Sequence, residues 1–196
     1  MRWLRTLVLF SKGGVVDSAD WHTVHESYVR SIGNIDHPYG SGSFTVRRKR
    51  RGPNSKWIRN GVGYLREHFL NHIVDVEGWR AEGFADLGLG AQPPIRLYPS
   101  MEEYPIDATI FGDFDLVTTG PNGTRVAIEW ETGNVSSSHR SMNKLVLALE
   151  SGSVSVGVLI VPSRLLYEHL TDRIGNFEEL THLIQRHGRD SAAGVA

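Results

Sequence analysis

The sequence predicts an α/β protein in which helices flank a mixed central β-sheet. Residues 107–119 and 124–131 are apolar, strand-like runs joined by the turn sequence GPNG, which predicts an antiparallel hairpin. A serine-capped helical stretch over 136–150 and a nearly continuous apolar run at 154–162 come next, and the latter predicts a buried strand. Strand, helix and strand in succession predict a right-handed crossover, so the sheet should contain both parallel and antiparallel neighbours.

The chain has 196 residues, which suits a single domain over 1–196 that buries roughly two thirds of its unfolded surface. Apolar residues at helical spacing predict helices over 18–32, after a cap signal from Ser18 and Asp20, and over 61–77, closed by Gly78. In the second helix we expect Tyr64, Leu65, Phe69, Ile73 and Val76 to line one side. We also expect a buried strand or helical turn at 6–10, a loop or short strand at 33–56 with 44–46 its only ordered hint, and a loop at 80–105. Helices at 163–171 and 176–187 and a flexible tail at about 189–196 complete the prediction.

The composition narrows the class of protein. The chain has no cysteine, which excludes disulfides, thiolate nucleophiles and cysteine zinc sites, and fits a cytoplasmic location. Its apolar runs fall short of the roughly 20 residues that span a bilayer, so we expect no membrane partner.

Positive charge is concentrated in one segment of the chain. Eight of the 21 Lys and Arg residues lie between Arg47 and Arg66, where there is no acidic residue. The rest of the chain therefore holds 13 basic residues against all 22 acidic ones. A basic segment on an acidic body indicates a protein that meets polyanions on one face, and we assign this role to residues 40–60.

Acidic residues interrupt the two apolar runs of the predicted hairpin. Asp107, Asp113 and Asp115 fall in or next to the first run, and Glu129 and Glu131 fall in the second. Alternation along a strand places Val126, Ile128 and Trp130 on one face and the two glutamates on the other. On the first strand it places Phe114 and Leu116 on one face and the aspartates on the other.

The acids of the hairpin are candidate metal ligands. If the apolar faces pair, Asp113 or Asp115 lies beside Glu129 and Glu131. Carboxylates so close together repel unless they share a cation, and hard oxygen ligands suit Mg²⁺. The alternative is a solvated polar face, which is common for a Glu-x-Glu pair on a strand.

These residues carry a resemblance to a known family. Asp115, then Glu129-Trp130-Glu131 on the next strand, then a helix and the buried strand GVLIVP resemble the PD-(D/E)XK nuclease core. The likeness is to type II restriction endonucleases of the BamHI, BglII and BstYI kind, and extends to the helices at 18–32 and 61–77. The general motif ends in Lys, whereas position 131 is Glu, as in the BamHI variant.

The resemblance implies a restriction-endonuclease-like core at 107–162 that hydrolyses phosphodiester bonds in double-stranded DNA. It assigns Asp115, Glu129 and Glu131 as catalytic Mg²⁺ ligands, for one or two ions, with Asp113 the rival of Asp115. A fourth site residue falls by position on Glu67, with an ordinary surface glutamate as the alternative. Lys144 is a candidate to replace the lysine that the motif lacks here. The alternative is a solvated lysine on the helix surface.

The resemblance also implies how DNA is held. The segment after the second acid would enter the major groove, and its residues are Asn134, Ser136, Ser137, Ser138, His139 and Arg140, with helix capping as the alternative for the serines. A phosphate clamp is expected from Arg47, Arg48, Lys49, Arg50, Arg51, Lys56 and Arg59. A basic loop without a specific role is the alternative.

The resemblance also implies a homodimer that acts on a short palindromic site, here with a GATC core. It further implies a cognate DNA methyltransferase in the cell. The competing functions are a structure-selective repair or recombination nuclease with the same core and a non-catalytic DNA-binding protein.

Overall fold

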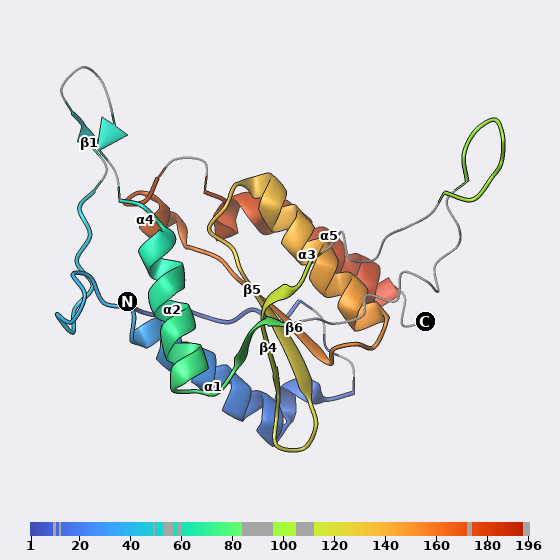
Figure 1. The fold of residues 1–196 in the computed structure, drawn as a ribbon, viewed down its shortest axis with the longest axis horizontal. Helices are drawn as coiled ribbons and strands as arrows, with labels where there is room; N and C mark the ends of the chain where they lie inside the picture. The colour runs from blue at the N-terminus through green and yellow to red at the C-terminus, as the bar shows by residue number, and fades with distance from the viewer. Residues whose placement is uncertain are drawn as a thin grey trace.

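A four-stranded mixed sheet lies between two groups of helices, with α1 and α2 on one face and α3 on the other (Figure 1). This computed structural model describes residues 1–9, 11, 13–48, 50–52, 57–58, 60–83, 96–104, 112–171 and 174–193. The helices are η1 (Val15–Asp17), α1 (Ala19–Gly33), α2 (Gly63–Asp75), α3 (Val135–Glu150), α4 (Arg164–Tyr167) and α5 (Phe177–Ala193). The strands are β1 (Arg50–Arg51), β2 (Trp57–Ile58), β3 (Arg80–Gly83), β4 (Phe114–Thr119), β5 (Arg125–Trp130) and β6 (Val156–Ile160).

The strand order of the main sheet is β3-β4-β5-β6. β3 and β4 pair antiparallel, as do β4 and β5, with Leu116 opposite Ile128. β5 and β6 pair parallel, with Trp130 opposite Ile160. The predicted α/β class and mixed sheet are therefore confirmed, and β5 occupies an interior position between two partners.

Two apolar clusters hold the layers together. The larger one joins α1 and α2 to one face of the sheet, where the Phe69 ring stacks on Trp130 with centroids 4.4 Å apart. The smaller one joins α3 to the opposite face through residues such as Ala127, Leu145 and Ala148. Burial of these side chains on both faces of β5 provides most of the driving force that fixes this strand.

The two predicted amphipathic helices of the first half are confirmed in outline. The Ser18 hydroxyl accepts a hydrogen bond from the Trp21 N–H and so caps α1. In α2, Leu65, Phe69 and Ile73 are fully buried. The expectation for Val76 was wrong: its side chain is 68% exposed, because α2 ends at Asp75.

Several boundaries differ from the sequence prediction. Residues 80–83 form the edge strand β3 rather than a loop, and three of its four side chains are exposed, so no apolar pattern marks them. β4 begins at Phe114, and residues 107–111 of the predicted strand lie outside the described residues.

The described part of 6–10 forms no strand or helix, and Leu7 and Val8 are half exposed. β6 is only partly buried, because in the described sheet it has one neighbour. The last helix continues beyond residue 187 to Ala193.

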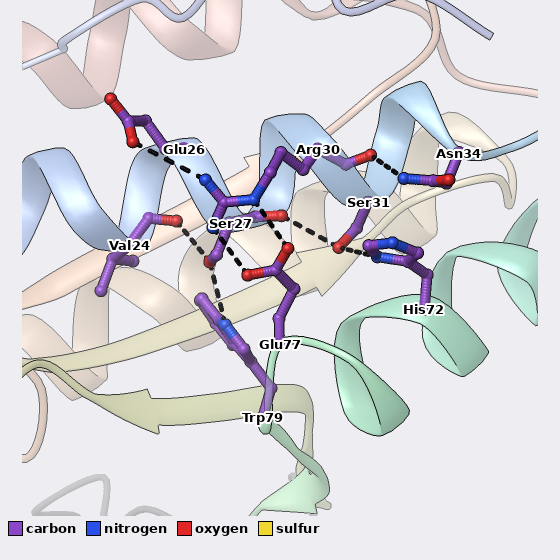
Figure 2. Close-up of polar contacts among 9 residues, drawn as sticks. All are labelled: Val24, Glu26, Ser27, Arg30, Ser31, Asn34, His72, Glu77 and Trp79. Atoms are coloured by element: carbon purple, nitrogen blue, oxygen red, sulfur yellow. Dashed lines mark hydrogen bonds and ion pairs between the residues drawn. The ribbon is translucent and has the colours of Figure 1, made fainter.

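Polar contacts lock the connection between α2 and β3 onto α1 (Figure 2). Arg30 of α1 donates two hydrogen bonds to the Glu77 carboxylate, at 2.8 and 2.7 Å. The Trp79 indole N–H donates to the Ser27 hydroxyl at 3.0 Å. These contacts hold α2 in the orientation from which its side chains reach the sheet. Within the described ranges, no helix combines the length and apolar character needed to cross a bilayer.

A buried carboxylate fixes the turn between β4 and β5. Asp20 of α1 accepts hydrogen bonds from the Asn122 backbone and side chain and from the Thr124 N–H. Its Oδ2 lies 2.7 Å from where a Cβ of Gly120 would stand, so only glycine fits there. Burial alone would raise the pKa of Asp20, but the hydrogen bonds from Asn122 and Thr124 outweigh it, and the pKa lies below its ordinary value.

We predict that Asp20→Asn lowers the free energy of unfolding, measured by urea denaturation, because the amide cannot accept all of these hydrogen bonds. A carboxylate with a lowered pKa stabilises the fold at pH values above its unfolded pKa, and this contribution is lost as the pH falls through the folded value. The difference between wild type and variant should therefore be largest near pH 7 and shrink on acidification. Asp17→Asn, at an exposed position, is the control. A gap that stays constant from pH 7 to pH 3 would contradict this account.

Candidate active site at the β4–β5 hairpin and helix α3

Two glutamates, one in β5 and one directly after it, are buried beneath α3. Glu129 and Glu131 retain 6% and 5% of their exposure. Val126, Ile128 and Trp130 point into the larger apolar cluster on the opposite face, as the alternation of the strand predicts. Removing two carboxylates from water costs free energy unless donors and cations surround them. Their contacts therefore define what this part of the molecule can do.

One hydroxyl of α3 bridges the two glutamates. Ser141 Oγ lies 3.3 Å from Glu129 Oε2 and 3.2 Å from Glu131 Oε2. A hydroxyl has one proton, so it donates to only one carboxylate at a time. The second oxygen of Glu131 accepts hydrogen bonds from the Gly133 N–H and from Ser137 Oγ. A Cβ at Gly133 would collide with both Ser137 Oγ and Glu131 Oε1, so a larger residue here would displace these two side chains.

Lys144 of α3 supplies a buried positive charge. Its ammonium forms an ion pair with Glu129 Oε1 and donates a hydrogen bond to the Asp113 carbonyl at 2.9 Å. It also lies 4.7 Å from the centre of the Phe114 ring. The residue is only 8% exposed, so the alternative of a solvated surface lysine is wrong. Lys144 faces inward because it is three residues after Ser141, on the same face of α3.

Asp115 of β4 lies at the end of the hairpin beside Glu129. Its Oδ2 accepts the Trp130 backbone N–H at 2.8 Å, and its Oδ1 accepts a hydrogen bond from Arg66 at 2.7 Å. Asp113, the rival candidate, has an exposed side chain and contributes its backbone carbonyl instead. Among these two aspartates, Asp115 is the one whose carboxylate reaches β5. Asp107 lies outside the described residues.

The charges at this site do not cancel. Three carboxylates, Asp115, Glu129 and Glu131, face two cations, Arg66 and Lys144. Burial raises the pKa of Glu129, the contact with Lys144 opposes this rise, and the Asp115 carboxylate adds to it, so the pKa remains above its ordinary value. A surplus of buried carboxylate oxygen fits a hard divalent cation such as Mg²⁺. Within the described residues no three acidic or histidine side chains already form a metal site, so the acids are held by protein partners instead.

The alternation expected for β4 fails at its first residue. Leu116 packs in the larger cluster with Ile128, but Phe114 packs in the smaller cluster under α3. The prediction that Phe114 and Leu116 share a face was therefore wrong. The ladder between β4 and β5 begins only at Leu116, whereas Phe114 pairs with Gly83 of β3. The Phe114 ring lies beneath the Lys144 ammonium.

Comparisons with known proteins place the chain in a family. The chain matches the family model "Restriction endonuclease BamHI" over residues 1–191. It belongs to the BamHI restriction endonuclease family. It is 54% identical over 143 residues to "Type II restriction enzyme BamHI" of Bacillus amyloliquefaciens, covering 73% of this chain and 58% of that protein. It is 36% identical over 151 residues to "Type II restriction enzyme OkrAI" of Oceanobacter kriegii, covering 76% of this chain and 63% of that protein. The chain thus spans about three fifths of the length of these relatives.

The fourth acid assigned from the family resemblance, Glu67, is not brought to the other three. Its side chain is exposed on α2, and it is the preceding residue, Arg66, that contacts Asp115. The register between β3 and β4 instead places Glu82 across from Asp115, because Ala81 pairs with Leu116 and Gly83 with Phe114. Glu82 also has a φ of 50°, which is uncommon for a residue other than glycine. Sequence reasoning missed Glu82 because β3 was assigned to a loop.

The residues expected to read DNA in this family take different places around α3. Asn134 caps the helix by accepting from the Ser137 N–H, so the cap is not one of the serines. Ser138 is fully buried and Ser137 contacts Glu131. Ser136, His139 and Arg140 are exposed. Asn134 is exposed as well, so four of the six predicted residues, Asn134, Ser136, His139 and Arg140, are open to solvent.

The expected phosphate clamp is described in part. Arg47, Arg48, Arg50 and Arg51 are exposed, and Arg48 forms an ion pair with Glu168 of the body at 2.9 Å. Lys49, Lys56 and Arg59 lie outside the described residues. β1 and β2 form a small antiparallel ladder on an arm that extends away from the helices (Figure 1).

We predict that Ser141→Ala destabilises the metal-free protein by about 1–3 kcal/mol, the usual cost of leaving a buried polar group without its donor. The measurement is urea denaturation in the presence of EDTA. Ser136→Ala, on the exposed side of the same helix, is the matched control and should change the stability by less than about 0.5 kcal/mol. Equal effects of the two substitutions would mean that the bridging hydroxyl contributes nothing.

Proposed function

We propose that this chain is a Mg²⁺-dependent, sequence-specific endonuclease that hydrolyses phosphodiester bonds in double-stranded DNA. The observation that carries the proposal is the buried pair Glu129 and Glu131 with Asp115 beside it, in a chain of the BamHI family. Carboxylates assembled at a cost in desolvation, with one negative charge in surplus, are typical of a site that binds a cation during its work.

The side chains of the site have separate tasks in this proposal. Asp115, Glu129 and Glu131 would hold Mg²⁺, which would supply polarisation of the scissile phosphate and a lowered pKa of the attacking water. Ser141 and the Gly133 N–H fix the orientation of the two glutamates, so that little reorganisation is needed when substrate arrives. Trp130 holds Asp115 through its backbone N–H. We add Glu82 to Glu67 as a candidate for the fourth acid, since Glu82 lies across from Asp115.

The larger assembly is proposed on the same basis. Two copies of the site are needed to cut both strands of a short palindrome, so we propose a homodimer with two-fold symmetry. A GATC core is proposed for the recognised sequence, and the exposed Asn134, Ser136, His139 and Arg140 are its candidate readers. A cognate DNA methyltransferase would protect the host DNA.

We predict that Glu129→Ala or Asp115→Ala lowers plasmid cleavage in Mg²⁺ by at least about 1,000-fold, as expected when one member of a catalytic unit is removed. DNA binding, measured by mobility shift in Ca²⁺, should survive in both variants. Glu150→Gln, an exposed acid at the end of α3, is the control and should cleave like wild type. Asp113→Ala and Asp107→Ala test the neighbouring aspartates, and Glu67→Ala and Glu82→Ala distinguish the two candidate fourth acids.

The pattern of products decides between the competing functions. Discrete fragments identify a restriction enzyme, whereas a smear or nicking indicates a structure-selective nuclease. Binding without cleavage by the wild-type protein indicates a DNA-binding protein whose acids are structural. Near-wild-type cleavage by Glu129→Ala would overturn the assignment of the site.

We predict that the double variant Arg47→Ala/Arg50→Ala weakens binding to cognate and unrelated duplexes alike, because the basic arm is proposed to contact phosphate rather than bases. The slope of log affinity against log salt should fall by about one for each phosphate that the variant no longer binds. Arg2→Ala/Arg5→Ala removes the same charge at exposed positions elsewhere and is the control. An unchanged slope in the first variant would remove the arm from the DNA interface.

A further inference from the structure

We propose that Lys144 is an internal counter-ion that holds Glu129 in the metal-free protein and gives up this contact when a divalent cation binds the acids. The inference rests on the proposed metal site and goes beyond it by naming the protein group that the metal must displace. Lys144 acts through Glu129, so it is a positioning residue.

The ion pair is built into the interior. The Lys144 and Glu129 side chains are only 10% and 8% exposed, so water screens their attraction weakly. A buried carboxylate without a cation is costly, and removal of one partner from such a pair strongly destabilises a protein. Lys144 therefore allows β5 to carry Glu129 under α3 before any metal is present.

The same ammonium stands in the way of a metal ion. It contacts Glu129 Oε1, while Glu129 Oε2 faces the Ser141 hydroxyl, so both carboxylate oxygens are already engaged. A divalent cation placed on the Glu129 carboxylate would meet the positive charge already at Oε1, and two cations in a low-dielectric pocket repel. Metal and ammonium therefore compete for one carboxylate.

Lys144 keeps two other partners when it releases Glu129. Its Nζ donates to the Asp113 carbonyl, and it lies over the ring of Phe114. Both interactions are made with the start of β4, directly before Asp115. The ammonium can thus withdraw from Glu129 without leaving the interior, which makes the exchange a local movement of one side chain.

The test is the affinity for Mn²⁺ without DNA, measured by calorimetry. Lys144→Met keeps the apolar stem over Phe114 but removes the charge, and we expect it to bind Mn²⁺ at least about fivefold more tightly than wild type, the lower end of typical coupling between two ligands. Lys144→Arg restores the charge and should return the affinity toward wild type. Arg30→Met removes a comparable ion pair between α1 and Glu77 and should leave the Mn²⁺ affinity unchanged.

A second measurement needs no substitution of Lys144 and covers the case in which Lys144→Met does not fold. With lysine labelled at Cε, the NMR signal of Lys144 should shift when Mg²⁺ is added, and the shift should disappear in Glu129→Gln.

The outcomes separate the two proposals. If Glu129→Gln binds Mn²⁺ as wild type does, the proposed metal site is wrong and this inference falls with it. If Glu129→Gln no longer binds Mn²⁺ but Lys144→Met binds no more tightly than wild type, the metal site stands and the role of Lys144 is refuted. A Lys144 signal that is unchanged at saturating Mg²⁺ refutes it as well.

Discussion

The burial of two glutamates of one strand beneath a single helix is the constraint on which the rest of this structure depends. Glu129 and Glu131 are withdrawn from water, and α3 contributes one lysine and one bridging serine that contact them. Hydrogen bonds and the ion pair offset part of the desolvation cost, but a negative charge remains in surplus. A fold that needed only stability would carry apolar residues here. The retained acids are better explained by chemistry than by packing.

The surrounding architecture keeps this strand in place. β5 pairs on both sides, and apolar clusters cover both of its faces. Asp20 of α1 fixes the turn that begins β5, and Asp115 of β4 accepts the Trp130 N–H near its other end. The acids are therefore set on a strand whose two ends are tied by carboxylates from other elements. Such rigid support is what a site needs if its ligands are to be placed before the substrate binds.

Features that arise from local periodicity can be predicted from the sequence, whereas features that depend on packing cannot. Strand alternation correctly separates Glu129 from Val126 and Trp130, because both faces of β5 are regular. It fails at Phe114, where the ladder with β5 has not yet begun. It also fails at β3, whose exposed RAEG sequence has no apolar pattern. The inward position of Lys144 could not be predicted, because it depends on how α3 sits over the sheet. The three-residue spacing places Lys144 on the same helix face as Ser141. That face can be recognised as the inward one only once the position of Glu129 is known.

The central claim is that the acids of the β4–β5 hairpin bind a divalent cation against a DNA backbone. The most direct measurement is the anomalous diffraction of a crystal of the complex with duplex DNA in which Mn²⁺ replaces Mg²⁺. The account predicts an anomalous peak within coordination distance, roughly 2.0–2.3 Å, of Glu129 and at least one of Asp115 and Glu131. Crystals with full DNA occupancy whose anomalous map has no peak at these side chains would contradict it.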